Sequence, residues 1–96
     1  SECAKRGHKI SIQKMNEYAE LLERRADRRS HMDFLYNAKQ THIIEFENVA
    51  SRKWGERTEE NLLYHAKQIR IITEDMEATQ LTITRINERL KKIPKY

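Results

Sequence analysis

Apolar side chains recur at alternating steps of three and four residues along the last third of the chain, from Leu62 to Ile93. This spacing places them on one stripe of an α-helix and is typical of the buried seam of a coiled coil. The predicted seam comprises Leu62, Ile69, Ile72, Met76, Thr79, Ile83, Ile86, Leu90 and Ile93. We expect these residues to bind partner helices, although a seam carries almost no information about what the pairing is for.

A second apolar stripe predicts another long helix over residues 11–54. Its first part comprises Met15, Tyr18, Ala19, Leu22 and Ala26, and its second part Met32, Tyr36, Ile43, Phe46 and Ala50. Extending this register places Arg25, Arg29 and Lys39 at positions that should be buried. Long basic side chains can cover a groove with their stems while their heads reach water, so we expect loose packing rather than a helix break.

Several signals change together around Gly55, where the heptad phase of the first stripe slips before the second begins. Gly55 suits a helix C-cap, Thr58 suits an N-cap, and Glu59 and Glu60 suit the first turn of a new helix. The sequence therefore predicts a turn over residues 55–58. One bent, continuous helix is the alternative, because a lone glycine costs only about 1 kcal/mol relative to alanine.

We predict an all-α fold: an elongated coiled coil whose two long helices fold back near Gly55 into a helical hairpin. Residues 1–10 are expected to form a flexible basic lead-in, residues 59–93 the second helix, and residues 94–96 a tail after Pro94. An open arrangement that leaves both stripes for partner chains is the alternative. Isoleucines at both core positions favour more than two strands without fixing their number.

Composition narrows the classes of function. Of the 96 residues, 38% are hydrophobic, which is too few for a large globular core, and 35% are charged. The net charge of +4 favours acidic partners without requiring them. Charges of both signs are mixed along the chain, as on solvated coiled-coil flanks, whereas nucleic-acid domains usually concentrate positive charge on one face.

The single cysteine, Cys3, excludes an internal disulfide framework and fits a reducing compartment. The sequence has neither an apolar run long enough to span a bilayer nor the core of a signal peptide. We therefore expect a cytoplasmic protein without a transmembrane segment.

No pattern in the sequence predicts catalysis, a cofactor or a small-molecule substrate, because there is no phosphate-binding glycine loop and no nucleophile elbow. His31 and His42 face one side of a helix but lie about 16 Å apart, too far to share a metal ion. His65 and Thr79 occupy seam positions, where we interpret them as polar residues tolerated in loose layers. Control of register or of pH sensitivity is the alternative.

Two features predict contacts with partners. Arg24, Arg25, Arg28 and Arg29 form two pairs one helical turn apart, which suits a phosphate or a glutamate-rich segment. An ordinary solvated surface is the alternative, since Glu20, Glu23 and Asp27 lie at helical spacing from them. Trp54 beside the predicted turn either anchors a partner or caps the end of the hairpin.

Taken together, the basic lead-in, the arginine cluster, the joint at Gly55 and the seam resemble the short, basic coiled-coil subunits of ciliary axonemes that bind tubulin or dock other filaments. The resemblance implies a location at the cytoskeleton or in a cilium and binding to a microtubule lattice, with basic residues facing acidic tubulin. From the residues we predict a structural, non-enzymatic protein that docks or cross-links helical partners in a large, hetero-oligomeric assembly. The alternatives are a nucleic-acid-binding basic coiled coil and a vesicle-tethering helix-bundle subunit.

Overall fold

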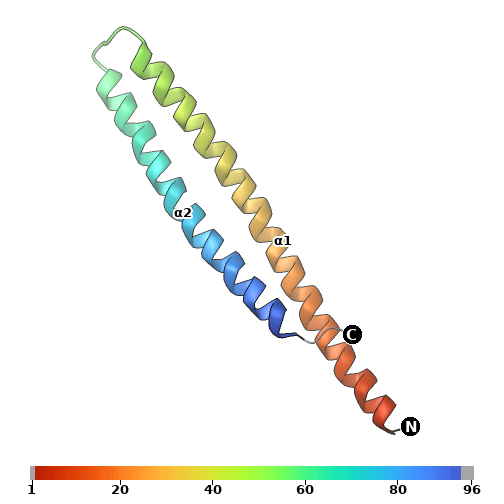
Figure 1. Ribbon diagram of the computed structural model, residues 1–96. Coiled ribbons are helices and arrows are strands. Elements are labelled where there is room, and N and C mark those ends of the chain that lie inside the picture. Colours follow the sequence, from red (N-terminus) through yellow and green to blue (C-terminus); the bar gives the residue numbers. More distant parts are fainter. Residues whose placement is uncertain (1, 94–96) are drawn as a thin grey trace.

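The protein consists of two long α-helices joined by one short turn. The computed structural model describes the backbone of residues 2–93 and the side chains of residues 12–93. Helix α1 spans Glu2–Ser51 and α2 spans Thr58–Lys92, and they run antiparallel (Figure 1). The hairpin extends 80 × 14 × 14 Å along its principal axes. The predicted all-α helical hairpin is confirmed, and the alternatives of one continuous helix and of an open arrangement are wrong.

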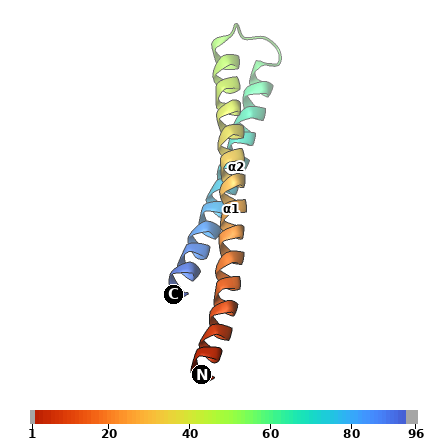
Figure 2. The same ribbon diagram turned by 90° about the vertical axis from the view of Figure 1, so that its right-hand side faces the viewer.

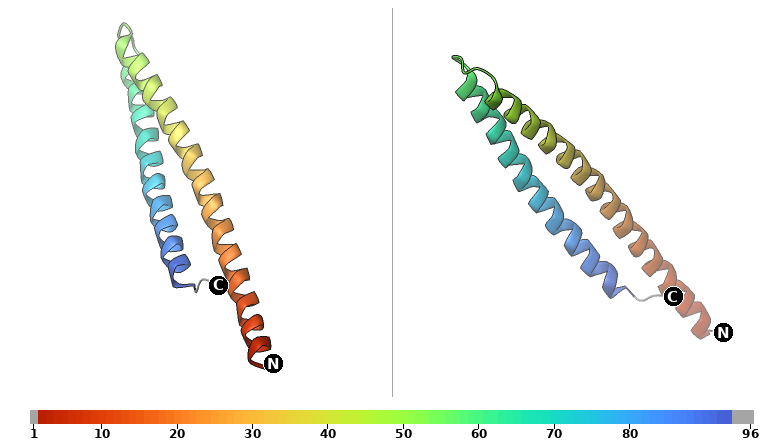
Figure 3. Two further views of the ribbon diagram at one scale, coloured as in Figure 1. Left: turned by 45° about the vertical axis from the view of Figure 1, so that its right-hand side comes forward. Right: turned by 45° about the horizontal axis from the view of Figure 1, so that its top comes forward.

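The two helices cross at a shallow angle along their length. In Figure 2, α2 lies on one side of α1 near the turn and on the other side near the free ends. Both views in Figure 3 show the helices side by side, with the N-terminal part of α1 extending past the end of α2. Helices with seven-residue apolar repeats cross in this way, because winding keeps the two stripes in contact.

Helix α1 begins earlier than the sequence pattern predicts. Residues 2–10, expected to be a flexible lead-in, continue the helix, which starts at Glu2 rather than near Ser11. Each residue added to an existing helix gains a hydrogen bond while fixing only its own backbone, so a helix can extend without an apolar stripe. Gly7 lowers helix stability by about 1 kcal/mol and does not end it. The predicted tail, residues 94–96, lies outside the described residues.

The turn connects Ser51 to Thr58 and is held by hydrogen bonds between Gly55 and Thr58. The Gly55 N–H donates to Thr58 Oγ1 at 2.8 Å, and the Thr58 N–H donates to the Gly55 carbonyl at 3.3 Å. The predicted N-cap role of Thr58 is wrong, because Thr58 is the first residue of α2 and Arg57 precedes it at the cap. Gly55 is not the C-cap of α1 either, since the helix ends at Ser51 and Gly55 has no positive φ.

Helix α2 turns its predicted seam toward α1. The buried seam residues are Ile72, Thr79, Ile83, Ile86 and Ile93, and the half-buried ones are Leu62, Ile69, Met76 and Leu90. Near the free ends, Leu21 of α1 packs in one cluster with Ile86, Leu90 and Ile93. The seam is therefore used within the chain to pair α2 with α1, and its use by other chains stays a prediction.

Helix α1 turns a slightly different stripe toward α2 than the sequence predicts. Leu35 is 5% exposed, whereas its predicted seam neighbour Tyr36 is 54% exposed. The same shift by one residue occurs at Leu21, which is buried beside half-buried Leu22, and Arg29 is exposed rather than buried. A leucine gains more from burial than a tyrosine, whose hydroxyl needs a polar partner, so the helix rotates toward its leucines.

Candidate interaction surfaces

The predicted arginine cluster of α1 lies opposite a second basic segment of α2, because the helices run antiparallel. Between them is an open groove with a volume of about 600 Å³. We call it the arginine groove, since four of its lining residues are arginines. The lining residues are Arg24, Asp27, Arg28 and His31 from α1, and Thr82, Arg85, Ile86 and Arg89 from α2.

The four arginines predicted as one cluster have different surroundings. Arg24 and Arg28 line the groove, whereas Arg29 is exposed and does not line it. Arg25 is half-buried, and its Nη1 donates a hydrogen bond of 2.9 Å to Asn87 Oδ1 on α2. Arg25 therefore links the two helices, and only half of the predicted cluster lines the groove.

The positive charge of the groove is only partly neutralised by the chain itself. Arg24 Nη2 lies 2.9 Å from Glu20 Oε1, and Arg89 Nη2 lies 3.9 Å from Glu17 Oε1. Both pairs are solvent-exposed, with 57% of each arginine side chain accessible, so they add little to stability. No ion pair to Arg28 or Arg85 is formed by the residues that the structure describes.

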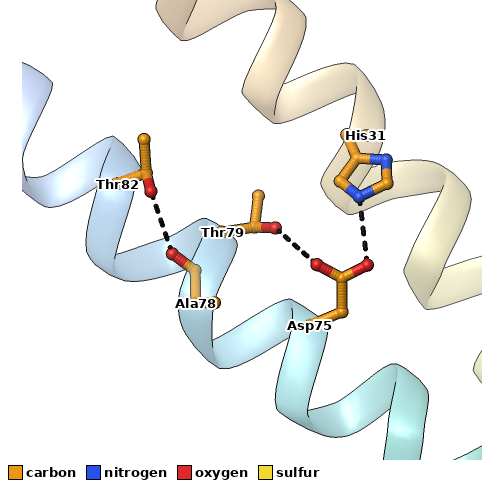
Figure 4. Close-up of polar contacts among 5 residues, drawn as sticks. All are labelled: His31, Asp75, Ala78, Thr79 and Thr82. Carbon is orange, nitrogen blue, oxygen red and sulfur yellow. Dashed lines mark hydrogen bonds and ion pairs between the residues drawn. The ribbon is translucent and has the colours of Figure 1, made fainter.

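A polar contact between the helices lies at the end of the groove nearest the turn. His31 Nε2 lies 3.2 Å from Asp75 Oδ2, and Thr79 Oγ1 donates to Asp75 Oδ1 at 3.4 Å (Figure 4). Thr82, which also lines the groove, donates instead to the Ala78 carbonyl of its own helix at 3.1 Å. Asp75 therefore connects α1 to the buried hydroxyl of Thr79.

Two histidines meet between the helices closer to the turn. His42 Nδ1 and His65 Nδ1 are 3.0 Å apart, so one ring donates and the other accepts. Tyr64 contacts both rings, with centroid distances of 6.1 Å to His42 and 5.1 Å to His65. His65 occupies the seam position that the sequence predicts. Its pairing with His42 was not predicted, because the α1 stripe was drawn through the neighbouring Ile43.

Exposed apolar side chains continue the face of the molecule that contains the groove. Phe34 follows the groove residue Asp27 by seven residues, and Ile71 precedes the groove residue Arg85 by fourteen, so each shares a side of its helix with the groove. Phe34 is 67% exposed and Ile71 is 54% exposed. Phe34 also stacks on the groove residue His31, with ring centroids 6.4 Å apart. We call the groove together with Phe34 and Ile71 the groove face.

A second apolar surface lies on the other side of α1, near the free ends. We call it the free-end stripe, and it comprises Ile12, Met15, Ala19, Leu22 and Ala26. Ile12 is 44% exposed and Met15 is 59% exposed. Ala26 precedes the groove residue Arg28 by two residues, which is about 200° around an α-helix. The stripe therefore faces away from the groove.

Trp54 lies in the turn, where 64% of its surface is exposed. Most of the residue is therefore accessible to solvent, and capping of the hairpin end stays a prediction. Its role as an anchor for a partner stays a prediction.

The sequence predictions missed Arg85, Arg89 and His31 as members of a site. Nothing in the sequence sets Arg85 and Arg89 apart, since they are ordinary flank residues beside the seam. The signal that would have found them is the register of the hairpin. Once the turn is placed, residues whose numbers add to about 110 lie side by side, as Arg25 and Asn87 do.

Comparisons with known proteins do not assign a family. No family model, curated protein or solved structure matches the chain. No helix in the described part of the chain has a segment long and apolar enough to cross a membrane. Within residues 12–93, no three histidine, cysteine, aspartate or glutamate side chains are grouped so that they could hold a metal ion.

Proposed function

We propose that this chain is a non-enzymatic docking module that binds helices of other proteins along the outside of its hairpin and holds them in a larger assembly. One observation carries the proposal: among the described residues, eleven large apolar side chains are exposed, whereas six apolar side chains are buried. Folding alone therefore leaves more of the bulky apolar groups exposed than buried. Exposed apolar surface of this kind is typical of protein interaction sites.

A helical partner fits the spacing of these exposed groups. Exposed Ile12 and Met15 and half-buried Leu22 lie three and seven residues apart, so they form one stripe along α1. Two helices also enclose little volume, and no described side chain is fully buried, since none is less than 2% exposed among the large residues. A third helix packed along this stripe would bury it and complete a small bundle.

We further propose that the assembly is cytoskeletal. The resemblance to axonemal subunits supports this, together with a rod-like shape of 80 × 14 × 14 Å and a net charge of +4. A long, basic rod contacts a repeating acidic lattice over many weak points, which favours electrostatic association. Co-sedimentation with microtubules tests this narrower proposal, and absence of the chain from the pellet at low salt would contradict it.

The docking proposal itself is tested by changing the free-end stripe without changing charge. In cells that contain the protein, we expect the tagged wild-type chain to migrate on size exclusion in a large complex. The double variant Ile12→Gln/Met15→Gln should migrate as the free tagged chain, because it removes apolar contacts while keeping helix-forming residues. The matched control Gln13→Asn/Asn16→Gln alters neighbouring exposed positions and should stay in the complex.

Cross-linking mass spectrometry on the same complex identifies the partner. Lys14 lies between the two substituted residues, so its cross-links should join it to a helix of another protein. The proposal would be wrong if the wild-type chain sediments as a compact monomer, or if the stripe variant and its control leave the complex to the same extent.

A further inference from the structure

The arginine groove is the feature of the molecule that apolar docking leaves unexplained. Four guanidinium groups surround it, and the carboxylate of Asp27 is the only acidic group in its lining. Two of the arginines come from α1 and two from α2, and the antiparallel packing of the helices brings them together. The groove is therefore a product of the fold, and neither helix alone provides it.

The arginines are arranged in two rows with helical spacing. Arg24 and Arg28 are four residues apart on α1, and Arg85 and Arg89 are four residues apart on α2. Within each row, the two side chains are separated by about 6 Å along the helix axis. A ligand that spans the groove must therefore present negative charges at a similar repeat.

The floor and the surroundings of the groove are not those of a purely ionic surface. Ile86 is 7% exposed and lies at its base, and the exposed Phe34 and Ile71 continue the same face toward the turn. A ligand that covers this face meets positive charge at one end and apolar side chains at the other. A face that is positively charged at one end and apolar at the other suits an amphipathic segment.

We propose that the arginine groove binds a carboxylate-rich helical segment of a partner protein. Glutamates four residues apart on a helix repeat at the same distance as the arginines, and guanidinium groups bind carboxylates with paired, charge-assisted hydrogen bonds. The end of the segment nearest the hairpin turn packs apolar side chains on Phe34 and Ile71. The inference rests on the proposed docking function and names the chemistry of the partner on the groove face.

A polypeptide fits the groove better than a nucleic acid does. Glu17 and Glu20 lie at its rim, where each contacts a groove arginine, and Asp27 lies in its lining. A chain of phosphates would bring negative charge against these carboxylates at every position. A helix with separated glutamates can place them at the arginines and its polar or basic residues at the rim.

The test uses the full chain and three probes. The first is a synthetic helical peptide with glutamate pairs four residues apart, the second is the same peptide with glutamines, and the third is oligothymidylate. The double variant Arg28→Gln/Arg85→Gln removes the two arginines without ion-pair partners among the described residues. The control Arg29→Gln/Arg70→Gln removes the same charge at exposed positions outside the groove.

By fluorescence anisotropy, the groove variant should bind the glutamate peptide at least about tenfold more weakly than the wild type, and the control less than about threefold more weakly. The glutamine peptide should bind the wild type about as weakly as the glutamate peptide binds the groove variant. All substituted positions are exposed, so circular dichroism should show unchanged helix content.

Three results would overturn the inference. The first is an equal loss of affinity in the groove variant and in its control, which means that only net charge matters. The second is no binding of the glutamate peptide to the wild type. The third is tighter binding of oligothymidylate that the groove variant abolishes, which makes the groove a polyphosphate site. Ile12→Gln/Met15→Gln separates the two proposals, because it should leave peptide binding unchanged while releasing the chain from its assembly.

Discussion

The two halves of the hairpin are packed differently. The free-end half, residues 12–35 and 72–93, contains all of the buried apolar side chains among the described residues: Leu21, Leu35, Ile72, Ile83, Ile86 and Ile93. In the loop half, residues 36–71, the only buried residue is Thr58, at the start of α2. The layers of the loop half include the His42–His65 pair and the half-buried Lys39.

This difference shows that one continuous hairpin divides its tasks along its length. In the free-end half, close packing of aliphatic side chains fixes how α1 and α2 pair, and this register brings the arginines of the groove together. The free-end half also buries one polar seam residue, Thr79, but the loop half combines polar layers with no buried apolar side chain, which weakens packing while specifying which residues meet. The loop half should therefore open more readily than the free-end half, as faster amide hydrogen exchange would show.

The largest expected effect comes from removing an aliphatic group from the free-end half. Ile86→Ala should destabilise the hairpin by about 3 kcal/mol, because it deletes a side chain that is 7% exposed and packed against Leu21. The matched change in the loop half, Ile69→Ala, removes a half-buried side chain and should cost only about 1 kcal/mol. Urea unfolding followed by circular dichroism measures both, and equal losses would contradict the proposed division.

The next largest effect should come from making the loop half resemble the free-end half. The double variant His42→Leu/His65→Leu replaces the paired rings by aliphatic groups and should stabilise the hairpin by about 2 kcal/mol. Either single variant leaves one half-buried imidazole without its partner, so each should gain less than half of that amount. A double-mutant cycle by thermal unfolding measures the coupling, and simple additivity would show that the 3.0 Å contact contributes nothing.

A smaller effect is expected where the loop half ends, at the turn. Thr58→Ala removes the hydroxyl that accepts the Gly55 N–H and should destabilise the hairpin by about 1 kcal/mol. Thr58→Ser keeps the hydroxyl and serves as the control, with a much smaller loss. If both variants unfold at the same urea concentration, the hydrogen bond does not stabilise the turn.

The helix α2 could be predicted from the sequence almost residue by residue. Its seam residues are aliphatic at nearly every core position, and their alternatives on the flanks, such as Arg70 and Glu77, are charged. One rotation of the helix then buries most of the seam, while apolar flank residues such as Ile71 and Leu81 stay exposed. The turn near Gly55 was predicted for a similar reason, because several independent signals coincide there.

The stripe of α1 could not be predicted with the same accuracy. Leu21 and Leu22 are adjacent and equally apolar, and Leu35 is adjacent to the aromatic Tyr36, so two rotations of the helix bury similar numbers of apolar or aromatic residues. The choice between them depends on what α2 presents opposite, which is a tertiary contact. The arginine groove was missed for the same reason, since Arg24 and Arg85 are distant in sequence and meet only through the register of the hairpin.

The smallest expected effect concerns Gly55, the residue on which the sequence argument for a turn depended most. Gly55 has no positive φ, and a Cβ built at this position meets no atom within 4 Å. The turn therefore uses its backbone N–H and carbonyl, which any residue except proline provides. Gly55→Ala should keep both hydrogen bonds and stabilise the hairpin by about 0.5 kcal/mol, because alanine restricts the unfolded chain more than glycine does. Gly55→Pro, which removes the N–H, should destabilise the turn as Thr58→Ala does, and a loss of stability in the alanine variant would mean that the turn needs glycine for its conformation.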